Sequence, residues 1–218
     1  MSHRNSQLTY YHAHRCTRGY SMLETLIVVA LITILSALAL PQMIAQRRLS
    51  RSLGVTREIL SQLRQARQMA MSQRQAVTFQ YNDTLKQICI IDHNSNPGAA
   101  IYAASGYPNT VGSRVLNTTP LATGGLIRSE ITYGVPAGVP NVPLGDGISM
   151  TPLLNSQINV TFQPDGSVID AAGNPLGIGL FIYNSVTPQG TAAAMSVVGA
   201  SGRIKIWRYD QNANAFAE

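Results

Sequence analysis

The sequence holds few side chains of the kinds that catalyse reactions or bind metals. Its four histidines are His3, His12, His14 and His93, and three of them fall at the extreme N-terminus. His93 alone cannot form a zinc site, which takes three or four ligands. The sequence shows no nucleophile paired with a base, no glycine-rich phosphate loop after a strand and no cluster of paired carboxylates. We therefore expect a protein that is not an enzyme and that uses no cofactor or metal.

One carboxylate, Glu24, stands where an acid is costly. It begins an apolar run, and none of the 22 residues from Thr25 to Gln46 is charged. As a helix this run would be about 33 Å long, which is enough to cross a hydrocarbon core of roughly 30 Å. An acidic residue costs about 2.5–3.5 kcal/mol at the centre of a membrane helix and less near its boundary. Glu24 is therefore a functional candidate, and its partner must be a cation at a similar depth.

Two simpler interpretations of the N-terminal segment compete. The basic start, the apolar run and the small residues around Ala39 also fit a secretory signal peptide cut near that residue. The run also fits an ordinary single-pass membrane anchor. Neither interpretation needs an acid at position 24. Arginines lie on both sides of the run, so their counts alone leave its orientation open.

The segment Arg18-Gly19-Tyr20-Ser21-Met22-Leu23-Glu24, with the apolar run to Pro41, resembles the class III signal of type IV prepilins and type II secretion pseudopilins. The resemblance implies that a prepilin peptidase cuts after Gly19 and that Tyr20 becomes an N-methylated N-terminus. It makes Glu24 the fifth mature residue, and Pro41 matches the family's helix-interrupting proline. The family usually has Phe where this chain has Tyr20, and its best-known leaders are shorter.

This cut would supply the cation that Glu24 needs. The new α-amino group of Tyr20 would lie on the same helical turn as Glu24 in one molecule. In a neighbouring, axially shifted subunit the amine would face Glu24 directly. Assembly would then neutralise a charge that is costly while the subunit is alone in lipid.

A helical pattern continues beyond Pro41 to about Ala76, which predicts one long helix. Its first half is apolar all round, and its second half has a single apolar stripe that we expect to pack against the head. Pro41 and Gly54 are weak points at which the helix could bend or melt. The stripe comprises Leu49, Leu53, Val55, Ile59, Leu60, Leu63, Ala66, Met69 and Ala70.

The pattern changes to short β-rich runs from Val77 onward. Strands are predicted at 77–81, 87–91, 158–162, 179–183, 194–198 and 202–207, with loops and short strands over 93–127 and an irregular loop over 134–147. Asp165-Gly166 is predicted to form a tight turn and not a catalytic or calcium site. Cys89 is predicted to be a buried strand thiol.

The predicted fold is α+β and type IV pilin-like, with one long N-terminal helix packed on an antiparallel β-sheet head. Residues 1–19 would be a cleaved cytoplasmic leader and 20–46 the transmembrane, filament-core half of the helix. Residues 47–76 would be its amphipathic half, and 77–218 a β-rich head in the periplasm.

Three further stretches resemble one branch of the same family, the H-type pseudopilins and FimT-like minor pilins. Residues 63–70 read L-x-x-A-R-x-x-A, residues 162–167 read F-x-P-D-G-S, and residues 198–207 read V-x-x-x-G-R-I-K-I-W. The resemblance covers both ends of the chain and leaves residues 93–150 unmatched.

A basic cluster lies near the C-terminus. Arg203, Lys205 and Trp207 alternate along a predicted strand and so share one of its faces, and Arg208 follows. Two cations and an aromatic ring on an exposed face would suit DNA phosphates and a base, and some FimT-like pilins use a similar Gly-Arg-x-Arg stretch for DNA uptake. A solvated strand face is the simpler alternative.

The charge distribution limits the possible partners. The high pI belongs to residues 1–74, because residues 75–218 carry six basic and eight acidic side chains. The resemblance implies a structural subunit, expected to be a minor one, of a type II secretion pseudopilus or a type IV pilus. Its partners would be other pilins or pseudopilins, the prepilin peptidase and the assembly platform of the bacterial inner membrane. The alternatives are a DNA-binding minor pilin and a plain secreted or anchored β protein.

Overall fold

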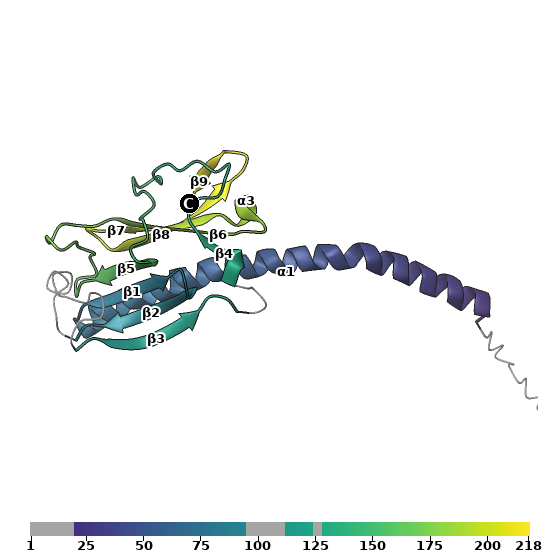
Figure 1. Ribbon diagram of the computed structural model, residues 1–218, viewed down its shortest axis with the longest axis horizontal. Coiled ribbons are helices and arrows are strands. Elements are labelled where there is room, and N and C mark those ends of the chain that lie inside the picture. The colour runs from purple at the N-terminus through teal and green to yellow at the C-terminus, as the bar shows by residue number, and fades with distance from the viewer. Residues whose placement is uncertain (1–19, 95–111, 124–127) are drawn as a thin grey trace, which may run out of the picture. The chain divides into compact units, whose positions relative to one another are not determined.

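The computed structural model describes residues 20–94, 112–123 and 128–218 (Figure 1). The chain forms two compact units, Met1–Ile44 and Ala45–Glu218. Helix α1, Met22–Gln73, contributes to both units. It continues through Pro41 and Gly54, so neither residue ends the helix as the sequence allowed.

The C-terminal end of α1 is set by local backbone geometry. Arg74 adopts a positive φ of 53°, and the N–H of Gln75 donates to the carbonyl of Ala70 at 3.2 Å. This is the hydrogen bond by which a left-handed residue closes a helix. The predicted long helix is confirmed, although it ends a little before the predicted boundary near Ala76.

The head contains two antiparallel sheets, which confirms the predicted antiparallel β head. The first sheet has the order β3-β2-β1-β5, with β1 Val77–Asn82, β2 Gln87–Asp92, β3 Arg114–Pro120 and β5 Gln157–Phe162. The second has the order β4-β6-β7-β8-β9, with β4 Ile131–Tyr133, β6 Ile178–Asn184, β7 Ala193–Val198, β8 Arg203–Asp210 and β9 Ala215–Ala217. The head also has two short helices: η1 Arg128–Glu130 directly precedes β4, and α3 Pro188–Thr191 lies between β6 and β7.

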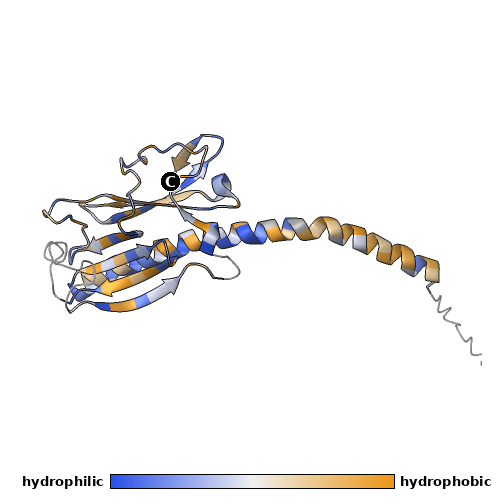
Figure 2. Cartoon of the chain, in the orientation of Figure 1, coloured by the Kyte–Doolittle hydropathy of each residue, from blue (hydrophilic) through white to orange (hydrophobic). Residues whose placement is uncertain are grey.

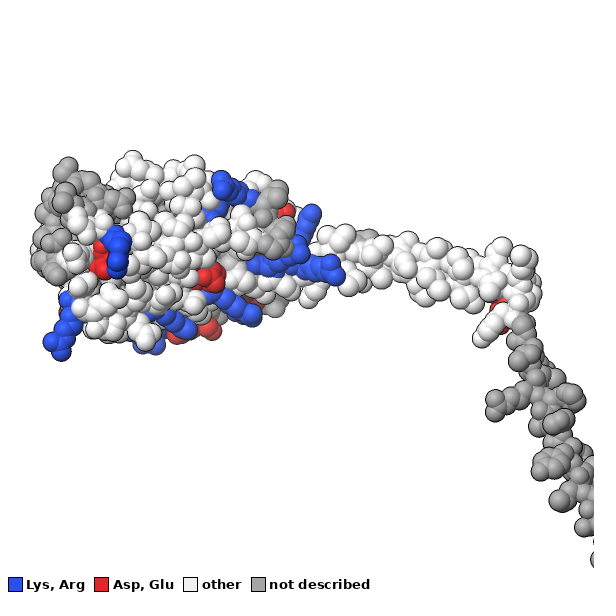
Figure 3. All heavy atoms as spheres, turned by 90° about the horizontal axis from the view of Figure 1, so that it is seen from below, with Lys and Arg blue, Asp and Glu red and all other residues white. Residues whose placement is uncertain are grey.

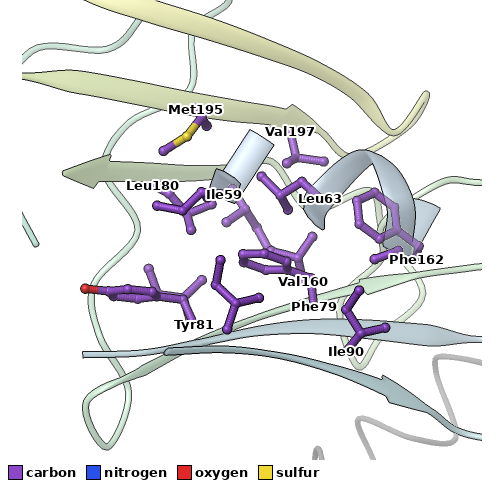
Figure 4. Packing of buried hydrophobic residues seen from close by; sticks show 14 of the residues in the cluster. Ile59, Leu63, Phe79, Tyr81, Ile90, Val160, Phe162, Leu180, Met195 and Val197 are labelled. Atoms are coloured by element: carbon purple, nitrogen blue, oxygen red, sulfur yellow. The ribbon is translucent and has the colours of Figure 1, made fainter. Parts of the chain in front are cut away.

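The main core of the head lies where the buried stripe of α1 meets inward residues of both sheets (Figure 4). Ile59 and Leu63 of α1 are fully buried there. This confirms that the stripe packs against the head, since its spacing places these residues on one face of the helix. The strand residues in contact with this cluster include Phe79, Tyr81, Ile90, Val160, Phe162, Leu180, Met195 and Val197.

Two smaller predictions in the head are also confirmed. Gly166 has a φ of 83°, and Asp165 Oδ1 accepts hydrogen bonds from the backbone N–H and the hydroxyl of Ser167. These bonds favour the charged form and hold the pKa of Asp165 below its usual value. Cys89 on β2 is a free, buried thiol.

Candidate functional site

The start of α1 is fixed by a side-chain cap. The Leu23 N–H donates to Ser21 Oγ at 3.3 Å, and the Thr25 N–H donates to the Ser21 carbonyl at 3.1 Å. Ser21 is therefore the N-cap, and Glu24 falls in the first turn, where the helix dipole favours a carboxylate. Ser21 and Glu24 have the spacing of a capping box. This spacing is visible in the sequence and marks the start of the helix.

The stretch that follows buries nothing within the described chain. From Tyr20 to Ile44 every side chain that the structure describes is exposed, and Leu38 for example is 67% exposed. The stretch is predominantly hydrophobic (Figure 2), and its only charged side chain is the acid near its start (Figure 3). In the described residues α1 is the one helix long and apolar enough to cross a membrane.

The other residues of the predicted processing and assembly signal are placed only in part. Gly19 lies outside the described residues, so the cut after it stays a prediction. Tyr20 is 79% exposed just before the helix. Pro41 lies within the continuous α1. Tyr20 and Glu24 are thus close in sequence at the start of one helix, as the signal requires.

The predicted exposed aromatic face on β8 is wrong. Trp207 is only 6% exposed and packs with Leu144, Phe181 and Ala194 in a second cluster. Its Nε1–H donates to Ser196 Oγ at 2.8 Å. The irregular segment between β4 and β5 contributes Leu144 to this cluster. It therefore covers the face of β8 that carries Trp207, which alternation alone did not distinguish from a solvent-exposed face.

The three basic residues of β8 do not form one surface. Lys205 Nζ lies 2.6 Å from Glu218 Oε2 and 4.9 Å from the centre of the Trp207 ring. Arg203 is exposed, with a Glu218 oxygen 4.0 Å away. Arg208 is exposed on the opposite face of the strand, because successive side chains alternate. The structure therefore brings Arg203 and Lys205 together through Glu218 and separates Arg208 from them.

His93 is a buried core residue. Its Nε2 lies 2.6 Å from Thr78 Oγ1, which in turn lies 2.7 Å from Thr161 Oγ1. Burial lowers the pKa of His93 to about 4, against a smaller opposing effect of the Asp92 charge. Within residues 20–94, 112–123 and 128–218, no three His, Cys, Asp or Glu side chains lie together as a metal site.

The described chain thus combines a helix that is exposed and apolar in its first half with a two-sheet α+β head. No family model and no curated protein matches the sequence. Two crystal structures of the type IV minor pilin FimU from Pseudomonas aeruginosa PAO1 are similar, with TM-scores of 0.40 and 0.41 at 16% and 14% identity. They cover 71% of this chain and 86% and 90% of their own. At such scores and identities these similarities do not by themselves assign a function.

Proposed function

We propose that this chain is a structural, minor subunit of a type IV pilus or a type II secretion pseudopilus. The proposal places it in the bacterial inner membrane with its head in the periplasm until it enters the filament. The supporting observation is the exposed, charge-free apolar stretch of α1 with Glu24 at its start. The resemblance of residues 18–41 to a prepilin signal gives that stretch its role.

The apolar stretch needs a non-aqueous surrounding. Leaving a Leu, Ile or Val side chain in water instead of burying it costs about 1.5–3 kcal/mol, and the stretch exposes many of them. Lipid satisfies such a helix because its backbone hydrogen bonds are internal. Packing against the same stretch of other subunits satisfies it equally, so one segment serves both as anchor and as filament core.

Glu24 would make the transfer from lipid to filament selective. In the proposed mature chain the Tyr20 amine is protonated at neutral pH, and it lies just before the helix, one residue ahead of the N-cap Ser21. A neighbour displaced along the helix axis by the distance between its Tyr20 amine and Glu24 would bring that amine level with Glu24. The ion pair would neutralise two charges within an apolar surrounding. Contact with a correctly staggered neighbour would therefore be favoured over contact with lipid.

The test compares the two glutamates of α1. We expect mass spectrometry of the processed protein to find N-methylated Tyr20 at its N-terminus. We expect Glu24→Ala to be processed and to remain in the membrane, with at least tenfold less subunit in sheared filaments. Glu58→Ala is the control, because Glu58 lies in the amphipathic half and accepts a hydrogen bond from Gln62. An N-terminus near residue 40 would indicate a secretory signal peptide, and normal assembly of Glu24→Ala would reject the proposal.

A FimT-like role in DNA uptake remains the alternative, through Arg203, Lys205 and Arg208. Its support is weaker than the sequence suggested, because Trp207 is buried and Lys205 pairs with Glu218. Retention of duplex DNA by the detergent-solubilised chain at low salt, and its loss in Arg203→Ala, would favour this alternative.

A further inference from the structure

The amphipathic half of α1 carries an excess of positive charge that the head does not neutralise. Between Ala45 and Gln73 the helix has one acid, Glu58, and six arginines. In the described residues the ion pairs are Lys86–Asp83, Arg203–Glu218 and Lys205–Glu218, so no carboxylate pairs with an arginine of α1. The six are Arg47, Arg48, Arg51, Arg57, Arg64 and Arg67.

Two of these arginines project from the exposed side of the helix. Arg57, Ser61, Arg64 and Gln68 are all exposed and follow one another at intervals of four, three and four residues. They therefore form one line along the helix, which we term the arginine ridge, with Arg57 and Arg64 about 10 Å apart along the axis. One shallow surface hollow is lined by these four residues together with Leu60 and Gln65.

A second hollow joins the ridge to the turn between β7 and β8. It shares Arg64 and Gln68 with the first and adds Arg67 and Arg203. Arg67 is held in place by two backbone carbonyls, since its Nη2–H donates to Ser201 at 3.0 Å and its Nε–H donates to Gly166 at 3.4 Å. No acidic residue lines either hollow.

The close approach of two turns builds this second hollow. Gly202 has a φ of 58°, and a Cβ there would lie 1.7 Å from the carbonyl oxygen of Gly166. Only glycine lets the two turns meet over Arg67, so the neighbouring Arg203 lies beside the helix arginines. The result is a surface in which three arginines, Arg64, Arg67 and Arg203, line one hollow, with Arg67 held in place by its two hydrogen bonds.

The composition of the two hollows indicates the kind of partner. Guanidinium groups favour carboxylate or phosphate, often through two hydrogen bonds at once. The hollows also expose Leu60, Met71 and Ile204, and they contain no aromatic ring for base stacking. Arginine and methionine beside apolar groups are typical of protein interfaces. The head itself presents exposed acids, among them Asp165 and Asp210.

We infer that the arginine ridge and the adjoining hollow dock the carboxylate-bearing head surface of the neighbouring subunit in the filament. This inference rests on the proposed function and adds a second contact to it, polar and outside the membrane. The charge excess that remains unpaired in one subunit is complementary to the net negative charge of residues 75–218 in another. Such contacts fix register and partner choice more than they add affinity.

The test uses the full chain in cells that assemble the filament. A photo-crosslinking amino acid at Ser61, between the two ridge arginines, is expected to capture a pilin-like subunit. Mass spectrometry should find the crosslink in a peptide with Asp or Glu. The double substitution Arg57→Glu/Arg64→Glu is expected to lower the amount of subunit in sheared filaments at least tenfold, with leader cleavage and thermal stability unchanged.

A matched control separates this contact from general charge effects. Arg114→Glu/Arg128→Glu makes the same change of charge at exposed arginines away from the ridge and should assemble normally. Replacing the crosslinked partner's acid by Lys should restore assembly of the double variant. Normal assembly of Arg57→Glu/Arg64→Glu, or crosslinks to nucleic acid or lipid in place of a subunit, would overturn the inference. Loss of cleavage after Gly19 would instead reject the proposed function itself.

Discussion

The leucines of α1 fall into two groups that differ in what surrounds them. Leu31 and Leu35 are 55% and 65% exposed, whereas Leu63 on the same helix is fully buried against both sheets. The first stretch of the helix is apolar on all its faces, whereas the second stretch has a single apolar stripe. The comparison shows that the first group has no partner within the described chain. Under the proposed function its partner is lipid or the same stretch of other subunits.

The same contrast applies to charge. In the apolar stretch Glu24 is the only charged side chain. In the amphipathic half one acid stands among six arginines. Each half of α1 therefore carries a net charge that no ion pair among the described residues neutralises, negative in the first half and positive in the second. Under the proposed function both are completed by a neighbouring subunit.

The largest expected effect separates the two leucine groups. Leu63→Ala should lower the free energy of unfolding of the head by about 3–5 kcal/mol, because it leaves a cavity in a closed core. Leu35→Ala should change it by less than about 0.5 kcal/mol. Denaturant titration of the detergent-solubilised chain, followed by fluorescence of the single Trp207, measures both. Equal effects of the two substitutions would show that the apolar stretch packs on the head.

The second prediction uses pH and concerns the head alone. The pKa of His93 is about 4 when folded and about 6.5 when unfolded, so between these values the unfolded chain binds more protons. Stability should therefore fall as pH drops from 6.5 to 4, by up to about 3 kcal/mol from this residue. His93→Gln does not titrate, and its stability should fall less over the same range.

Membrane insertion and filament assembly should not follow this titration, because His93 lies in the head. A wild-type pH profile that parallels that of His93→Gln would contradict the assignment. The difference between the two profiles isolates His93 from the carboxylates, whose protonation also lowers stability in acid.

The third prediction compares two glycines. Gly202→Ala should destabilise the head by about 2–3 kcal/mol, because the residue has a positive φ and its Cβ would collide with Gly166. Gly54→Ala, in α1 with nothing within 4 Å of its Cβ, should stabilise the helix by up to about 1 kcal/mol. Thermal unfolding of the two variants is the measurement. Opposite signs are expected, and destabilisation by both would show that Gly54 is also a contact site.

The elements with strong periodicity were predictable from the sequence. The stripe around Leu63 and six of the seven longer strands follow from spacing alone. β4 and β9 were missed because three residues carry no measurable alternation. β3 falls in the range 93–127, where loops and short strands were predicted without bounds, because its residues are exposed or half-buried on both faces and no apolar pattern marks it.

The error at Trp207 has a different cause. Alternation assigned it correctly to the same strand face as Lys205, but alternation does not show whether that face meets solvent. The face is covered by an irregular segment whose path depends on contacts distant in sequence, such as the packing of Leu144 on Trp207. In the candidate site, the role of Glu24 could be predicted because the residues of its signal are consecutive in the sequence. The arginine ridge is also local, since helical spacing places its residues in one line, but the adjoining hollow was not predictable because it requires the β7–β8 turn beside α1.

The smallest expected effect tests whether the two halves of α1 behave independently. Ser21→Ala removes the N-cap hydrogen bond to Leu23 and should cost the first turn about 1 kcal/mol. Amide hydrogen exchange in detergent micelles should therefore quicken at residues 22–25. Protection of the head strands should stay unchanged, because the substituted residue makes no contact in the core. Ser72→Ala is the control, because its hydroxyl donates only to Met69 within the helix and caps no end. Faster exchange in the head of Ser21→Ala would show that the start of the apolar stretch is coupled to the core, and the contrast between the two leucine groups would then no longer hold.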